Sequence, residues 1–225
     1  MRTKILLLLV VSFCIVITTN AQINNGRYLL GGSFNYYEAK NVQPNNYYSN
    51  NYGSLYTNIQ FGKVVKNNTV VGLILSSGNS NTHITNFPDS NYNKITQYSA
   101  GVFYRKYKSL FKTLYLFGEV DAAYVHSDNS QGLLQDKSDR LKSISDGGSV
   151  SFVPGISYAL CRRLQVELSM PNILSLSYSH FKTDNGNLTP TLNSDTKGNS
   201  FSFNASLNSI LFSNFGIGFK FLLGK

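Results

Sequence analysis

The chain has 225 residues, of which only 14% are charged, and its formal net charge is +9. Few charges combined with 15 tyrosines and 15 phenylalanines would promote aggregation of a soluble protein. The basic balance could suit nucleic-acid binding, but the basic residues form no single stripe interleaved with aromatic residues, so we predict no nucleic-acid partner.

Residues 1–21 have the pattern of an export signal. Arg2 and Lys4 give a basic start, an apolar run follows from Ile5 to Ile17, and Thr19-Asn20-Ala21 is a small-residue cleavage site. The apolar run is too short to cross a bilayer, which takes roughly 20 residues. We therefore predict a cleaved signal peptide at 1–21 and one mature domain at 22–225.

The cysteines and histidines predict neither a disulfide nor a metal site. Cys14 lies in the leader, where lipidation is disfavoured because the bulky Phe13 precedes it and the apolar run continues behind it. Cys161 is then the only cysteine of the predicted mature chain. The three histidines are far apart in the sequence, and none is paired with a cysteine: His83, His126 and His180. No cofactor is predicted.

Eight segments of the predicted mature chain alternate apolar or aromatic residues with small or polar ones. This is the two-residue period of a β-strand. In the first segment Tyr28, Leu30 and Phe34 form an apolar face and Gly31, Ser33 and Asn35 the opposite one. The expected strands are Tyr28–Ala39, Leu55–Val65, Thr69–Ser77, Ile95–Arg105, Leu114–His126, Ser149–Leu160, Leu164–Tyr178 and Ser202–Phe221.

The lengths of the connections favour a membrane barrel over a soluble β-sandwich, which also alternates. Short connections, namely Lys66–Asn68, Lys106–Thr113 and Cys161–Arg163, take turns with long polar ones, namely Lys40–Ser54, Gly78–Lys94, Ser127–Gly148 and Ser179–Asn199. Short periplasmic turns and longer external loops are typical of outer-membrane barrels, whereas a sandwich has no reason to sort its loops in this way. We predict an all-β, eight-stranded antiparallel up-and-down transmembrane barrel with four longer external loops, located in the bacterial outer membrane.

Two prolines and one long segment predict irregularities. Pro154 and Pro171 lie inside expected strands, where each removes a hydrogen-bond donor, so we expect a bulge or a strand end at both. The last segment is too long for one crossing, and we expect the chain near Asn208-Ser209 to bulge or project. A turn there would give ten strands, but it would also move the C-terminus to the other side.

The charges divide according to this topology. Eleven basic residues and no acidic ones lie at the expected periplasmic ends, whereas the external segments are nearly balanced. The basic rim would suit anionic lipid head groups or other polyanions, or it is a solvated rim with no specific partner. Glu119, Asp121 and Glu167 are expected on inward faces, with Arg105, and further Lys63 and Lys220, as partners. Charges inside a narrow barrel must be paired or hydrated, so we favour a structural charge network over an acid–base site.

Several passages resemble a known family. Asn58–Leu75, Tyr115–Tyr124 (YLFGEVDAAY), Ser151–Met170 and Phe201–Phe221 are similar to the small outer-membrane β-barrels often labelled "porin family" or OmpA-like transmembrane barrels. The resemblance covers essentially the whole mature chain, and it implies membership of that fold but no proven pore. Members often end on an aromatic residue that the barrel-assembly machinery recognises, whereas four residues follow Phe221 here.

Three kinds of function are compatible with these features. The leading hypothesis is a non-enzymatic barrel that stabilises the envelope or presents loops to an external ligand or surface, with outer-membrane lipids and the assembly machinery as partners. A narrow pore for small solutes is the alternative suggested by the polar inner face. A lipid-modifying enzyme is less favoured: His126, Ser127 and Asp128 supply the residue types of a Ser–His–acid site, but neighbours on a strand point to opposite faces.

Overall fold

The structure is a computed structural model that describes residues 23–42, 48–86, 89–133, 140–170, 173–184, 196–205 and 215–224. The expected export signal at 1–21, with Cys14, and the Asn208-Ser209 site lie outside these residues. Among the described residues there is no helix long and apolar enough to cross a membrane.

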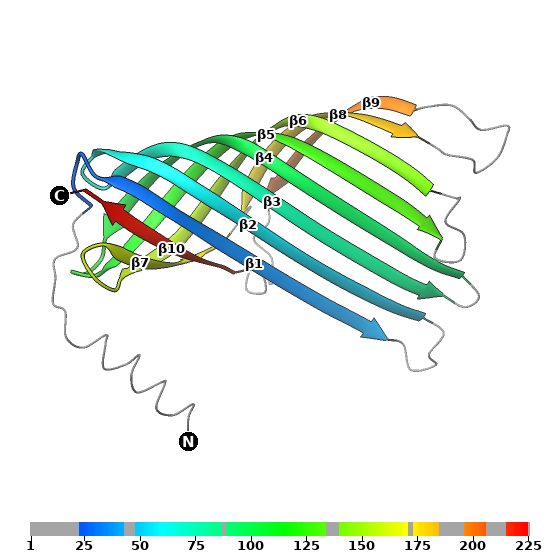
Figure 1. The fold of residues 1–225 in the computed structure, drawn as a ribbon, viewed down its shortest axis with the longest axis horizontal. Coiled ribbons are helices and arrows are strands. Elements are labelled where there is room, and N and C mark those ends of the chain that lie inside the picture. Colours follow the sequence, from blue (N-terminus) through cyan, green and yellow to red (C-terminus); the bar gives the residue numbers. More distant parts are fainter. Residues whose placement is uncertain are drawn as a thin grey trace, which may run out of the picture.

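Ten strands form one antiparallel sheet, which Figure 1 shows as a strongly twisted and curved wall. The strands are β1 (Tyr28–Val42), β2 (Tyr48–Lys66), β3 (Thr69–Asn86), β4 (Asp89–Ser109), β5 (Leu114–Leu133), β6 (Arg140–Ala159), β7 (Leu164–Ser169), β8 (Leu174–Asp184), β9 (Thr196–Ala205) and β10 (Gly216–Leu223). The neighbour order is β5-β4-β3-β2-β1-β10-β7-β6-β8-β9, and β5 also pairs with β6. This additional pairing closes the sheet on itself.

The ring is complete at one end of the molecule, which we call the closed end. There β10 joins β1 to β7, with Tyr28 opposite Leu223 and Gly218 opposite both Ser33 and Glu167. The ring contains β1 to β7 and β10, which is eight strands. Both described ends of the chain therefore lie side by side at the closed end. Toward the far end, and within the part of the chain that the structure describes, β1 beyond Phe34 pairs only with β2, and β9 pairs only with β8.

The expected seventh and eighth strands are each divided in two, which explains why the structure has ten strands. β7 ends at Ser169 and β8 begins at Leu174, and Pro171 itself lies outside the described residues. Both β7 and β8 pair with β6. The last expected strand corresponds to β9 and β10, which are separated by residues 206–215. The predicted count of eight therefore applies to the closing ring and not to the whole sheet.

Pro154 does not end its own strand, because β6 runs through it from Arg140 to Ala159. The interruption lies on the neighbouring side. β6 pairs with β8 up to Phe152 and with β7 from Gly155 onward, and the Pro154 carbonyl accepts a hydrogen bond from the Met170 backbone N–H at 2.9 Å. The missing proline donor thus falls where the partner strand changes, so the ladder loses little.

The expectation of four long external loops is wrong for three of them. The segments predicted as loops are largely strand, because β1 continues to Val42, β3 to Asn86 and β5 to Leu133. Only residues 43–47, 87–88 and 134–139 separate the strands there. Asparagine, serine and threonine occupy both faces of these extensions, so apolar alternation stops while the hydrogen-bonded ladder continues. The fourth segment, between β8 and β9, includes residues 185–195, which lie outside the described residues.

The outer face carries an apolar band bordered by aromatic side chains. At the closed-end border the exposed aromatic residues are Tyr28, Phe61, Tyr104, Tyr158, Phe219 and Phe221, and at the other border Tyr36, Tyr98, Tyr124, Tyr178 and Phe201. Exposed aliphatic residues such as Leu30, Leu73 and Val102 fill the space between them. Eight residues separate Tyr28 from Tyr36, which is about 26 Å along a strand and about 20 Å high at the usual barrel tilt. Exposed apolar or aromatic side chains thus occur on each of the ten described strands.

Candidate functional site: a charged layer inside the barrel

The inward carboxylate, guanidinium and amino groups of the described strands gather in one layer near the closed end. Five strand positions supply them: Arg105 on β4, Glu119 and Asp121 on β5, Glu167 on β7 and Lys220 on β10. Toward the far end the described inner wall is mostly uncharged, with small polar residues such as Ser76, Ser99, Ser149, Ser151, Ser175 and Ser177. The two-residue period accounts for this sorting, because each of the five occupies an inward register.

Arg105 is the centre of the charged layer. Its Nε donates to Glu119 Oε2 at 2.6 Å, and its Nη1 donates to Glu167 Oε2 at 2.7 Å and to the Tyr107 hydroxyl at 2.9 Å. Nη2 donates to Gln60 Oε1 at 3.1 Å. Arg105 is only 2% exposed, so these contacts replace water as partners of the guanidinium. Each of its nitrogens is therefore engaged.

Lys220 enters the same layer from β10. Its Nζ donates to Gln60 Oε1 and lies 3.8 Å from Glu167 Oε2. The aliphatic part of its side chain lies over Gly31, where even a Cβ atom would collide with it. Gln60 in turn donates to Glu119 Oε1 at 2.8 Å. Gln60 thus connects both cations with one of the carboxylates.

A layer of apolar and aromatic side chains fills the bore between the charged layer and the closed end. It contains Ile23, Leu29, Val64, Val70, Phe103, Tyr107, Tyr115, Phe117, Ala159 and Leu222, all buried. The Arg105 guanidinium carbon lies 4.4 Å from the centre of the Phe117 ring, a cation–π contact that joins the two layers. Gly155 makes room for the Phe117 ring, since a Cβ there would overlap it. We call this layer together with the charged layer the seal.

The segment before β1 lies across the mouth of the closed end. Ile23 is 1% exposed, and its carbonyl accepts a hydrogen bond from the Asn68 backbone N–H at 2.9 Å. The Gly26 N–H donates to the Val64 carbonyl, also at 2.9 Å. The segment is therefore docked on the β2–β3 turn and completes the apolar layer.

On its other side the charged layer borders a partly open cavity of about 70 Å³, large enough for several water molecules. Arg105, Glu119, Asp121, Glu167 and Lys220 all line it, together with polar residues from neighbouring strands such as Ser33, Asn35, Asn58, Ser151 and Ser169. Asp121 Oδ1 and Asn58 Oδ1 are buried and have no hydrogen-bond partner in the protein. The cavity is thus polar and has free acceptors.

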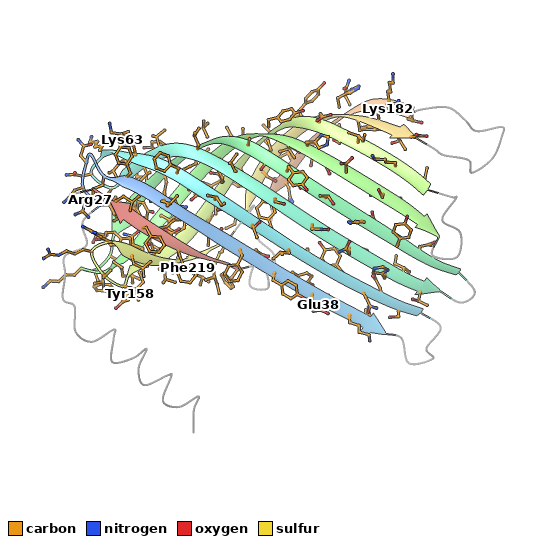
Figure 2. The ribbon with its side chains drawn as sticks, in the orientation of Figure 1. Arg27, Glu38, Lys63, Tyr158, Lys182 and Phe219 are labelled. Carbon is orange, nitrogen blue, oxygen red and sulfur yellow. The ribbon has the colours of Figure 1, made fainter. Side chains whose placement is uncertain are left out.

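The structure brings together five of the six residues expected in the interior network, but not Lys63. Lys63 lies opposite Tyr28 on the outer face and is exposed, because it shares the odd-numbered register of Ile59 and Phe61. Figure 2 places it at the closed end near Arg27. Asp121 lines the cavity but forms no ion pair within 4.0 Å among those found in the described part of the chain. Gln60 and Tyr107 were not foreseen, although both lie at inward registers.

Exposed basic residues surround the closed end just beyond the apolar band. Lys63, Lys66, Lys106, Lys108, Lys112, Arg162 and Arg163 are exposed there, and we call them the basic collar. Arg27 is half-buried and donates to the Arg162 carbonyl at 3.4 Å. Within the described residues no acidic side chain lies among them. The collar is therefore a ring of unneutralised positive charge.

The expected Ser–His–acid site is incomplete: His126 Nε2 lies 3.7 Å from Asp128 Oδ2, but Ser127 does not join them. His126 and Asp128 share the outward register of Tyr124, whereas Ser127 has the inward one. His126 Nδ1 instead lies 2.8 Å from Asp146 Oδ1 on β6, to which the Tyr124 hydroxyl also donates at 2.6 Å. The bond to Asp146 raises the pKa of His126, and the bonds from Tyr124 and His126 lower the pKa of Asp146. This cluster lies on the outer surface beyond the apolar band.

Comparison with known proteins gives a likeness of fold only. The sequence matches no protein-family model and no curated protein. Among solved structures, the outer membrane protein OprG from Pseudomonas aeruginosa aligns with a TM-score of 0.51 at 11% identity, over 90% of this chain and 98% of OprG. The fold is that of an outer-membrane β-barrel. The outer membrane protease OmpT from Escherichia coli also aligns, with a TM-score of 0.41 and 7% identity, over 91% of this chain and 96% of OmpT.

The described residues offer no arrangement for a metal ion, since no group of three or more His, Cys, Asp or Glu side chains is suitably placed among them. Cys161, in the turn between β6 and β7, is the free cysteine of the described chain.

Proposed function

We propose that the protein is an integral outer-membrane barrel with the closed end in the periplasm. Support comes from the apolar band, whose two aromatic borders match the girdles found where barrels meet the membrane surfaces. The basic collar lies directly beyond one border, where it would meet anionic lipid head groups. The opposite border is followed by nearly balanced charges, as on Glu38 and Lys182 at the far end (Figure 2).

Within this setting we propose a non-enzymatic, non-conducting barrel that acts as an envelope component and presents its far end to ligands or surfaces outside the cell. The seal carries this proposal. A solute that crossed the bore would have to separate Arg105 from Glu119 and Glu167 and displace Phe117 and Tyr107. Leaving buried charges unpaired costs several kcal/mol, so the sealed state is strongly favoured.

Single-channel recording in planar bilayers tests the seal. The refolded protein should give no conductance steps, and insertion should be verified by the gel shift that folded barrels show when samples are not heated. Repeated steps of uniform size from pure, inserted protein would refute the sealed barrel. A large-pore outer-membrane protein reconstituted in the same way is the positive control.

A narrow pore remains the second candidate, because the inner wall is polar and a cavity adjoins the charged layer. Such a pore would require the charged layer to rearrange. Recording should therefore be repeated over a range of voltages, since a rearrangement that moves Arg105 or Lys220 would respond to the field. Steps at high voltage only would favour this candidate over the permanently sealed barrel.

A further inference from the structure

The outer wall has a hollow within the apolar band, where β5, β6, β8 and β9 are successive neighbours (Figure 1). Its volume is about 370 Å³, and its lining is mostly apolar. Its walls are the outward side chains of Val150, Leu176, Tyr178 and Phe201, all of them exposed. Gly148 keeps the hollow open, because a Cβ atom there would meet nothing within 4 Å. The hollow therefore has room for a flexible hydrocarbon chain.

Polarity rises row by row along β8 and β9 from the hollow toward the far end. In the register of these two strands, Tyr178 is opposite Phe201, His180 is opposite Asn199, and Lys182 is opposite Lys197. The middle row is hydrogen-bonded, with His180 Nδ1 at 2.9 Å from Asn199 Oδ1. The sequence of apolar, aromatic, polar and charged rows matches a lipid read from its chains to its head group.

The outermost row consists of Lys182 and Lys197, both exposed, which we call the lysine pair. Residues directly opposite on antiparallel strands have Cβ atoms roughly 4.5–5.5 Å apart, and like charges in such a position are destabilising. An anion that contacts both ammonium groups removes this repulsion. Lys182 lies four residues beyond Tyr178, which is about 13 Å along the strand and about 10 Å in height at the usual tilt. Because lysine stems are long and flexible, both ammonium groups can bend back to the head-group layer.

The acidic residues on the neighbouring strands face cations of their own. Asp146 Oδ1 lies 2.8 Å from His126 Nδ1. Asp128 lies 3.7 Å from the same ring and 3.9 Å from Lys142 Nζ. On β8, Asp184 is two residues beyond the lysine pair and opposite Lys142 in the register. Among the described residues, the outer faces of β8 and β9 beyond the aromatic row thus carry two lysines and one acid.

We infer that the hollow and the lysine pair form one binding site for a membrane lipid with an anionic phosphate head group. One acyl chain of this lipid lies in the hollow against Leu176 and Phe201, and its phosphate contacts Lys182 and Lys197. A zwitterionic lipid binds less well, because the cationic group of its head group is repelled by the lysine pair. Free phosphate also binds less well, because it gains nothing from the hollow.

This inference rests on the proposed membrane insertion, because the hollow must face hydrocarbon. It depends neither on the seal nor on which end lies in the periplasm. The gel shift of the unheated sample verifies folding of each variant before binding is measured. A folded, inserted protein that holds no such lipid overturns this inference alone, whereas a chain that does not insert overturns the proposed function as well.

Native mass spectrometry of the refolded protein in detergent micelles, titrated with dioleoyl-phosphatidylglycerol, tests the site. We expect one lipid per barrel with saturable binding, and at least tenfold weaker binding of dioleoyl-phosphatidylcholine. Lys182→Gln/Lys197→Gln should bind the anionic lipid at least tenfold more weakly than the wild type. Lys40→Gln is the matched control, because Lys40 is an exposed lysine toward the far end of β1, and it should bind as the wild type does. Equal binding of the two lipids, or unchanged affinity of the double variant, would overturn the inference.

A second variant tests the hollow without touching the lysines. Gly148→Leu should fold, since a Cβ atom has open space there, and its side chain should fill the hollow and weaken binding of the anionic lipid at least fivefold. Wild-type affinity in this variant would show that no acyl chain occupies the hollow. In a competition arm, sn-glycerol 3-phosphate should not displace the lipid at equal concentration. Displacement would mean that the lysines take a free phosphate, and the lipid assignment would then be wrong.

Discussion

Replacing Arg105 by methionine should destabilise the barrel more than any other single change in the charged layer. The substitution removes the partner of two carboxylates, at 2.6 Å and 2.7 Å, and leaves both buried. Removing one member of a buried pair costs about 3–5 kcal/mol. Because the adjoining polar cavity is large enough for water molecules that would solvate Glu119 and Glu167 in part, we expect the lower half of this range, about 3–4 kcal/mol.

Urea unfolding of the protein refolded in lipid vesicles measures this loss, and tyrosine fluorescence can follow it because the chain has 15 tyrosines and no tryptophan. Lys63→Met is the matched control, since Lys63 is basic and at the same end but exposed, and it should change the unfolding free energy by less than about 0.5 kcal/mol. The double variant Arg105→Met/Glu119→Gln should recover part of the loss, because Glu119 no longer carries a charge and Glu167 keeps Lys220 as its partner at 3.8 Å. A loss below about 1 kcal/mol for Arg105→Met, or a double variant as unstable as the single one, would refute the reasoning.

Three further predictions concern packing, titration and orientation. Gly155→Ala should lose about 1–3 kcal/mol in the same urea assay, because its Cβ would overlap the Phe117 ring, whereas Gly148→Ala, which has open space, should change little; equal losses would contradict this packing. NMR titration should show the pKa of His126 above the usual histidine value, and Asp146→Asn should lower it. The contact between His126 and Asp146 stabilises the fold between the lowered pKa of Asp146 and the raised pKa of His126, where both groups are charged. Its contribution is lost as the pH rises through the pKa of His126, and it is lost again as the pH falls through the pKa of Asp146. An unshifted His126 in the wild type would show that the pair does not form. On intact cells a membrane-impermeant maleimide should label Lys40→Cys but not Cys161; labelling of Cys161 alone would reverse the proposed orientation.

The sequence predicts which residues of the site face the interior, because the two-residue alternation of a strand determines on which side each residue lies. Arg105, Glu119 and Glu167 could be assigned to the interior because each alternates with apolar outward neighbours. The same rule applied strictly would have excluded Lys63, which has the register of Ile59 and Phe61. Gln60 has an inward register, but nothing local marks an uncharged side chain as the link between Glu119, Arg105 and Lys220. Which inward charges come into contact depends on the register between neighbouring strands, and the alternation of residues within one strand does not reveal that register.

Strand ends were harder to predict than strand faces. The pattern used to find the strands is hydrophobic alternation, which stops where the outer face no longer meets an apolar medium. Hydrogen bonds between backbones do not require an apolar outer face, so β3 continues from Ser77 to Asn86 although nearly every position there is polar. For the prolines, β7 ends at Ser169, two residues before Pro171, which lies outside the described residues. At Pro154 the strand continues, and the interruption lies on the neighbouring side, where the partner of β6 changes from β8 to β7.

The strand extensions beyond the apolar band also determine how far the protein reaches. From Tyr98 at the band to Asp89 at the start of β4 there are nine residues, which span about 30 Å along the strand and about 20 Å perpendicular to the membrane at the usual tilt. In the proposed orientation, a peptide inserted at residues 87–88 would be held well outside the lipid surface on a hydrogen-bonded ribbon. Such a ribbon would limit the directions in which the peptide can point, so this position would suit the display of a binding sequence on the cell surface.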